Sequence, residues 1–200
     1  MGANNKQNVS TTRGVKGGYV FRAPLNTEGA PTKATYKTWS QSIPAGFVNL
    51  GYIPEDGFTE SVDIDSGTTL RDINLDTLDE ATGAATETIA FALMEMKKDA
   101  LAVQYGSANV TDAGGVLEVK HDWSNLEEHY QYVFLLLLKN DRLWVKYIPD
   151  GKVTEVGEFQ GNKTTAAQRE VTVTYIKDAN GNGCYDWIDS TETSAATSNP

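Results

Sequence analysis

Apolar and polar residues alternate along several short segments, which is the pattern of β-strands buried on one face. The alternation is clearest in residues 58–64 (FTESVDI), 86–94 (TETIAFALM) and 169–177 (REVTVTYIK), and it recurs in residues 116–120 and 152–159. These segments are separated by turn-forming residues at spacings typical of antiparallel sheets. The pattern therefore predicts a chain built mainly from β-strands.

Residues 130–138 (YQYVFLLLL) are apolar almost throughout, as in a central strand buried on both faces. Asn140-Asp141 is expected to turn the chain, so that residues 142–148 run back beside this strand. Pro149-Asp150-Gly151 is a strong turn signal and is expected to end that second strand.

Residues 97–105 (KKDALAVQY) have the composition of a short helix, with Leu101 and Tyr105 one turn apart and Gly106 placed as a C-cap. Little helix is expected elsewhere. The expected fold class is mainly β, an antiparallel β-sandwich or barrel with one short flanking α-helix.

Residues 65–83 (DSGTTLRDINLDTLDEATG) form an acidic segment with neither a helical nor a strand period. A connection of this length is unusual in a compact domain unless it has a function. Its large apolar residues must be buried on their own domain or on a neighbour, and they are Leu70, Ile73, Leu75 and Leu78.

The chain divides into three parts by composition. Residues 1–18 are polar and glycine-punctuated and are expected to be a flexible N-terminal arm. Residues 19–189 are expected to form a single β domain that carries the long loop 65–83, and residues 190–200 a disordered tail. No signal peptide and no apolar run long enough to span a bilayer is expected.

The 200 residues include 17 Lys and Arg against 27 Asp and Glu, which gives a net charge of -10. This balance argues against non-specific binding to nucleic-acid phosphates and against adhesion to anionic membranes. The single cysteine, Cys184, excludes an intrachain disulfide and a multi-cysteine zinc site.

No catalytic constellation is evident, and the protein is not expected to be an enzyme. The sequence contains no G-x-S-x-G motif, P-loop or dinucleotide-binding fingerprint. His121 and His129 flank Ser124, but proximity along the chain does not make a triad, and a surface loop is the favoured interpretation.

Residues 178–189 (DANGNGCYDWID) have the spacing of a calcium-binding loop. The candidate oxygen ligands are Asp178, Asn180, Asn182, Asp186 and Asp189, with Gly183 at the sharp bend. Flanking helices are not expected, however, and Asn-Gly-Asn-Gly between two apolar runs equally predicts a tight hairpin turn. The hairpin is the favoured interpretation, and calcium remains an alternative.

Several segments, taken in order, resemble a known protein family. Residues 17–24 (GGYVFRAP), 47–58 (FVNLGYIPEDGF), a long acidic loop and residues 86–106 (TETIAFALMEMKKDALAVQYG) follow one another. This order is similar to that of the major tail proteins of long-tailed, non-contractile bacteriophages, which are the subunits of the tail tube. The resemblance covers residues 17–177, and residues 178–189 are not assigned to the family pattern.

The resemblance implies a structural virion protein that self-assembles. Six copies would close into a ring, and stacked rings would form the tube through which the genome passes without specific binding. The implied partners are other copies of the chain and the tape measure, tail tip and tail terminator proteins, with assembly in the host cytoplasm. The loop 65–83, with Leu70, Ile73, Leu75 and Leu78, is then expected to dock on the next ring. The alternative is a calcium-stabilised β-rich surface or binding module that uses residues 178–189.

Overall fold

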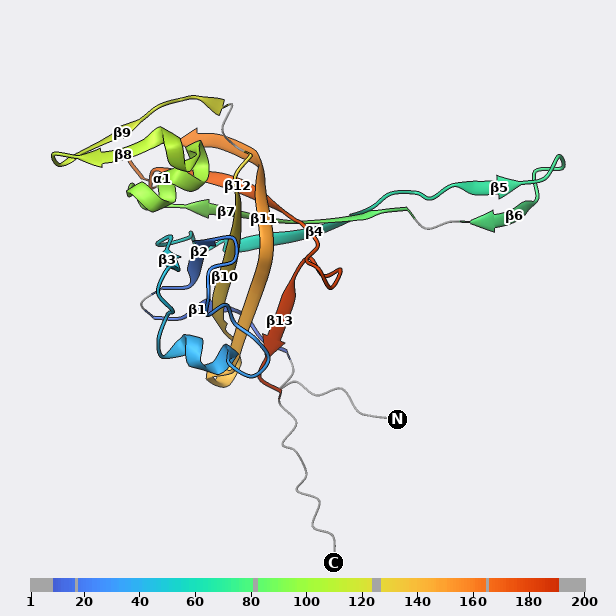
Figure 1. Cartoon of the computed structure of the whole chain (residues 1–200), viewed down its shortest axis with the longest axis horizontal. Helices are drawn as coiled ribbons and strands as arrows, with labels where there is room; N and C mark the ends of the chain where they lie inside the picture. Colours follow the sequence, from blue (N-terminus) through green and yellow to red (C-terminus); the bar gives the residue numbers. More distant parts are fainter. Residues whose placement is uncertain (1–8, 17, 81–82, 124–126, 165, 191–200) are drawn as a thin grey trace, which may run out of the picture.

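Most of the strands belong to one antiparallel sheet, shown in Figure 1. The computed structural model describes residues 9–16, 18–80, 83–123, 127–164 and 166–190. The sheet has the strand order β3-β2-β10-β11-β12-β7-β4. These strands are β2 (Val20–Pro24), β3 (Val48–Asn49), β4 (Phe58–Ile64), β7 (Ala85–Leu93), β10 (His129–Leu137), β11 (Leu143–Gln160) and β12 (Gln168–Tyr175).

Strand β11 is long enough to join two layers. Its first half pairs with β10 and its second half with β12, so the sheet folds back over its own face. Phe134 on β10 meets Phe91 on β7 with ring centroids 5.3 Å apart, although the two strands are not neighbours in the sheet. The predicted fold class, a mainly antiparallel β-sandwich or barrel with one α-helix, is confirmed.

The predicted turn at Pro149-Asp150-Gly151 is wrong, because β11 runs through it without a break. The register between β10 and β11 shifts here, from Tyr132 opposite Ile148 to Tyr130 opposite Gly151. A bulge accepts a proline because the bulged residue has no ladder hydrogen bond to lose. Turn-forming residues therefore mark a bulge in this chain and not the end of a strand.

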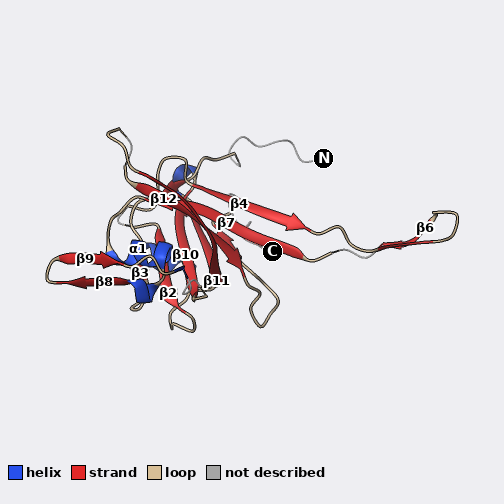
Figure 2. Ribbon diagram, turned by 90° about the horizontal axis from the view of Figure 1, so that it is seen from above, coloured by secondary structure: helices blue, strands red, loops and turns tan. Residues whose placement is uncertain are grey.

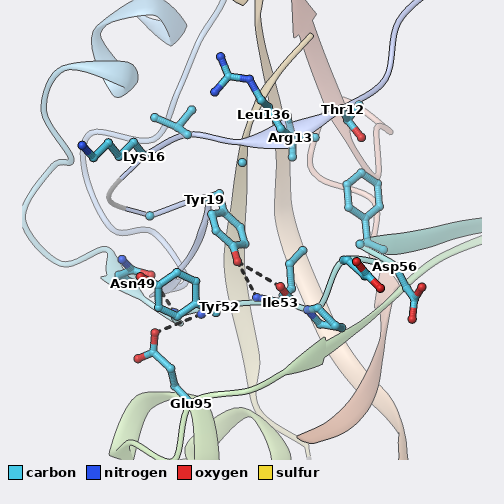
Figure 3. A pocket seen from close by; sticks show the side chains of 18 of the residues that line it. Thr12, Arg13, Lys16, Tyr19, Asn49, Tyr52, Ile53, Asp56, Glu95 and Leu136 are labelled. Carbon is cyan, nitrogen blue, oxygen red and sulfur yellow. Dashed lines mark hydrogen bonds between the residues drawn. The ribbon is translucent and has the colours of Figure 1, made fainter. Parts of the chain in front are cut away.

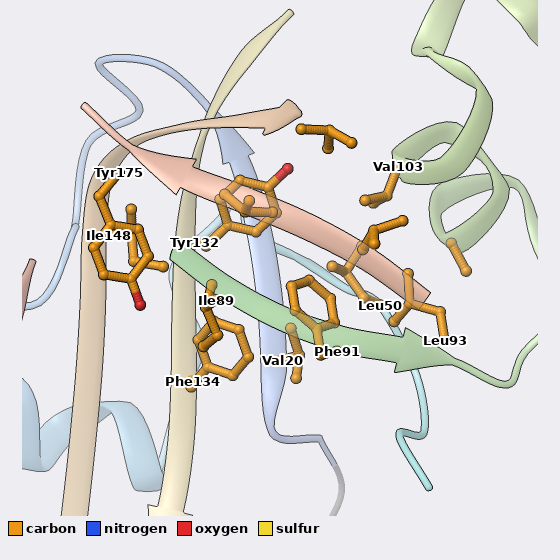
Figure 4. Packing of buried hydrophobic residues seen from close by; sticks show 14 of the residues in the cluster. Val20, Leu50, Ile89, Phe91, Leu93, Val103, Tyr132, Phe134, Ile148 and Tyr175 are labelled. Carbon is orange, nitrogen blue, oxygen red and sulfur yellow. The ribbon is translucent and has the colours of Figure 1, made fainter. Parts of the chain in front are cut away.

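The central strand β10 contributes to a core on each of its two faces, as its apolar run predicts. Tyr132, Phe134 and Leu136 pack into the larger cluster, which lies between the two layers (Figure 4). Val133 and Leu135 point the other way, toward Trp39. Trp39 lies in the 3₁₀ helix η2 (Tyr36–Ser40), which covers that face.

Helix α1 (Lys98–Tyr105) confirms the predicted helix, and it ends at Gly106 with a φ of 88°. Ala100 and Val103 join the larger core. The chain then passes through η3 (Ser107–Asn109) into a two-stranded hairpin of β8 (Val110–Ala113) and β9 (Val116–Val119). A third 3₁₀ turn, η5 (Lys139–Asp141), connects β10 to β11 where a turn is expected.

Two short strands at the ends of the described chain complete the sheet. β1 (Arg13–Gly14) pairs with β10, so this part of the expected N-terminal arm lies against the sheet. β13 (Tyr185–Ile188) pairs with the first half of β11. Residues 1–8, 17 and 191–200 lie outside the described residues, and they include half of the expected N-terminal arm and nearly all of the expected C-terminal tail.

Candidate functional site

The dominant surface feature is a two-stranded arm that projects from the body (Figures 1 and 2). β4 and β7 pair from Phe58 opposite Phe91 to Ile64 opposite Ala85. Beyond this pairing the chain continues outward into β5 (Thr69–Arg71) and β6 (Thr77–Glu80), which form a separate hairpin at the end of the arm. The described residues of the aperiodic segment 65–83 therefore form the outer part of a hairpin and do not fold onto their own domain.

The turn at the end of the arm is held by Asp72. Its carboxylate accepts hydrogen bonds from the backbone N–H groups of Asn74 (2.9 Å) and Asp76 (2.8 Å). Leu75 lies in this turn with a φ of 69°, a left-handed conformation that is unfavourable for a leucine. Such strain is often retained where a side chain has a function. Here it presents a leucine that is 72 % exposed.

The four apolar residues predicted to mediate assembly are all exposed on this arm. Ile73 is 98 % exposed, and Leu70, Leu75 and Leu78 are each exposed by more than half. A two-stranded hairpin is marginally stable by itself in water, and exposed apolar side chains add nothing to its stability. The arrangement is typical of a surface that is covered by a partner.

Sequence reasoning missed two further residues of the same surface, Val62 and Ile64 on β4, which are 58 % and 60 % exposed. They lie on the same face of β4 as Phe58, because side chains two apart share a face. Phe58 packs against the core, whereas Val62 and Ile64 continue its stripe beyond the edge of the body. The alternation in residues 58–64 predicts one buried face. It does not show that the core buries only the first part of this face and leaves Val62 and Ile64 exposed.

A buried lysine anchors the base of the arm. The ammonium of Lys146 on β11 is 2.9 Å from Glu60 Oε1 on β4 and 2.9 Å from Asp186 Oδ2 on β13. Burial lowers the pKa of Lys146, but the neighbouring Cys184 thiol and the two carboxylates outweigh burial and raise it. The Tyr175 hydroxyl also donates to Glu60 (2.7 Å). This network joins the arm to two other strands of the body.

Beside the base of the arm lies a cleft of about 800 Å³ (Figure 3). One wall is the segment around β1 and the other is the chain between β3 and β4. The Tyr19 hydroxyl ties the walls together, because it accepts a hydrogen bond from the Ile53 N–H (2.8 Å) and donates to the Ile53 carbonyl (3.2 Å). Burial raises the pKa of Tyr19, although the hydrogen bond with Ile53 opposes this. Tyr52 beside it is 66 % exposed.

The first half of the candidate calcium loop forms a turn that is closed by its own side chains. Asp178 Oδ1 accepts hydrogen bonds from the backbone N–H groups of Asn180 (2.9 Å) and Asn182 (3.0 Å). Asp178 Oδ2 accepts one from the Tyr185 hydroxyl (2.7 Å). These hydrogen bonds, first that of Tyr185, lower the pKa of Asp178.

The structure does not bring the other two candidate carboxylates to this turn. Asp186 lies on β13 and pairs with Lys146. Asp189 accepts hydrogen bonds from the Tyr36 hydroxyl (2.8 Å) and the Leu143 N–H (3.1 Å). Within the described residues there is no group of three or more His, Cys, Asp or Glu side chains positioned to hold a metal ion. Calcium binding stays a prediction, and thermal melts with and without calcium test it, since a bound ion raises the Tm.

The two histidines considered in the sequence have neighbours of different kinds. His129 Nδ1 lies 2.8 Å from Asp150 Oδ1. His121 packs against the rings of Tyr105 and Trp123. Ser124 lies outside the described residues.

In the part of the chain that the structure describes, no helix has the length and apolar character needed to cross a membrane.

The comparisons with known proteins agree with this picture. No curated protein matches the sequence. A sequence model of the family described as "Phage tail tube protein" matches residues 1–198. The match extends across nearly the whole chain and includes the arm, the cleft and the residues 178–189 that the resemblance left unassigned. The chain therefore belongs to the phage tail tube protein family.

Proposed function

We propose that copies of this chain close into rings, six to a ring as the resemblance implies, and that the rings stack into a tube through which the phage genome leaves the virion. The family supports the coarser statement that this is a structural tail tube protein of a bacteriophage virion. The proposal includes no catalytic step.

The exposed apolar arm is the observation that carries this proposal. Burial of a single leucine or isoleucine side chain contributes about 1.5–3 kcal/mol, so the exposed residues of one arm supply a substantial contact when another copy covers them. An arm that leaves one part of the body and docks on a different part of the next copy makes a heterologous contact. Repetition of such a contact generates open, filament-like assemblies.

The charge of the chain supports its role as a conduit. A net charge of -10 gives an assembled tube a strongly negative overall character. Like charges repel, so such a wall does not retain DNA phosphates, and the genome passes without specific binding. Tape measure, tail tip and tail terminator proteins would then contact the ends or the lumen of the tube, with assembly in the host cytoplasm.

Electron microscopy of an arm-shortened variant tests the proposal. Residues 66–83 are replaced by Asn-Gly, which joins Asp65 to Ala84, where the Asp65 N–H already donates to the Ala84 carbonyl (3.0 Å). Asn-Gly favours the tight turn that closes a two-residue hairpin, so the body should fold normally. We expect hollow tubes from the concentrated wild-type protein and none from the variant.

Val116→Ser is the matched control, because Val116 is 64 % exposed at the end of the other hairpin, β8–β9. This variant should form tubes as the wild type does. Tubes of normal length from the arm-shortened protein would contradict the proposed role of the arm.

A further inference from the structure

The cleft beside the base of the arm has no assigned occupant. We propose that it receives the end of the arm, residues 69–78, from another copy of this chain. This inference rests on the proposed function and specifies which surface of the neighbouring subunit the arm contacts.

A copy does not fill its own cleft with its own arm. Phe58, at the start of β4, lines the cleft, whereas Ile73 lies at the far end of the arm. About 15 residues separate them, and an extended strand rises about 3.3 Å per residue, so the distance approaches roughly 50 Å. The arm leaves the body as a continuous hairpin and does not fold back (Figures 1 and 2). An arm that occupies the cleft therefore comes from a second copy.

The two surfaces match in polarity. The cleft presents Tyr19, Tyr52, Ile53, Phe58 and Trp144. Its volume of about 800 Å³ accommodates several aliphatic side chains, since pockets of about 300–1,000 Å³ enclose whole ligands. The arm offers leucine and isoleucine side chains that are exposed on their own copy. Docking removes both apolar surfaces from water.

The charged residues of the two surfaces favour one orientation of docking. Arg13 and Lys16 lie on the wall around β1, and Asp56 and Glu95 lie on the opposite side of the cleft (Figure 3). Arg13 also pairs with Asp141, and Glu95 pairs with Lys97. At the end of the arm, β5 carries Arg71, whereas Asp76 and Asp79 lie in the turn and on β6. Asp72 follows Arg71 directly, so the end of the arm is acidic apart from Arg71. The favoured orientation places the acidic residues beside Arg13 and Lys16 and places Arg71 beside Asp56.

Cross-linking between two variants tests this docking. Both carry Cys184→Ser, which removes the native thiol; one adds Ile73→Cys and the other adds Tyr52→Cys. Both positions are exposed, so neither substitution should disturb the fold. The proteins are mixed in equal amounts, assembled and treated with a short bismaleimide, and the covalent dimers are counted by denaturing electrophoresis and mass spectrometry. The control mixture replaces Tyr52→Cys with Val116→Cys.

We expect several-fold more Ile73–Tyr52 cross-links than Ile73–Val116 cross-links in assembled samples. If tubes form and the two yields are equal, the cleft is not the docking site, although the proposed function stands. If the wild-type protein and the mixtures never form tubes, the proposed function fails and this inference fails with it.

Discussion

Among single residues, Leu75 combines a strained backbone with an exposed side chain. A leucine at a φ of 69° carries a cost that glycine in the same turn avoids. Because its side chain is exposed, the leucine does not contribute to the stability of the isolated subunit. Burial of the Leu75 side chain by another copy would offset the cost of the strained backbone.

Leu75→Gly should therefore separate stability from assembly. We expect the Tm of the unassembled subunit to stay the same or rise slightly, because the strain is relieved. We expect tube formation to weaken by about tenfold, which corresponds to the loss of about 1.5 kcal/mol of burial. Melting curves and sedimentation velocity measure the two effects. The control is Asn26→Gly, at a φ of 60° in another loop; equal assembly of both variants would contradict the assignment.

Asp189 gives the subunit an acid-sensitive contact. Burial raises its pKa, but the hydrogen bonds from Lys37, Tyr36 and the Leu143 N–H outweigh burial and lower the pKa below the usual 3.8. The ionised Asp189 carboxylate therefore stabilises the folded subunit fully above pH 3.8. This contribution is lost as the pH falls through the lowered pKa of Asp189 in the folded state.

We accordingly expect the Tm to fall as the pH is lowered from about 4 to 2, and Asp189→Asn to show a smaller fall over that range. Thermal melts across pH 2–6 measure the effect. Asp112→Asn, at an exposed position on β8, is the control and should behave as the wild type does. A profile for Asp189→Asn that is identical to the wild-type profile would show that this carboxylate does not contribute.

At the scale of elements, strands could be predicted where one face packs against the core, because this packing requires apolar residues at regular positions. Residues 58–64 alternate and form β4 with the same bounds, and the apolar run 130–138 matches β10 within one residue. The strand through Pro149 was not predictable, because turn and bulge use the same residues and only the neighbouring strands distinguish them. The arm was not predictable for a related reason. A hairpin with no cover on its own subunit has no buried face, so its sequence has no period.

Gly151 tests the account of β11 as one continuous strand between two layers. A Cβ atom at this position would lie 2.8 Å from Val173 Cγ1 and 3.0 Å from Tyr132 Cδ2. We expect Gly151→Ala to lower the free energy of unfolding by about 1–3 kcal/mol, because the packed core must shift. Gly157→Ala is the control on the same strand, since its nearest contact would be 3.4 Å. Urea denaturation compares the two, and equal stabilities would contradict the close packing at Gly151.

At the scale of the whole molecule, the arm and the body have different roles. The body is stabilised by its own cores and by the Lys146 network, which fixes where the arm begins. The arm extends beyond the body and leaves its apolar side chains in water (Figure 1). The same division explains which site residues were predictable. The sequence indicated the apolar residues of the arm because they lie in an acidic segment with no helical or strand period; they are Leu70, Ile73, Leu75 and Leu78. The cleft was not predictable, because it is formed by segments that are distant in the sequence.

Hydrogen exchange in the arm measures whether another copy buries it in the tube. Amide exchange in residues 69–80 is compared between the isolated subunit and the assembled tube, with the β8–β9 hairpin as an internal reference. In the isolated subunit a lone hairpin opens often and exchanges quickly. The account predicts that assembly slows exchange in the arm by about tenfold or more, well beyond any change in β8–β9. Exchange in the arm that is equally fast in tubes and in subunits would contradict it.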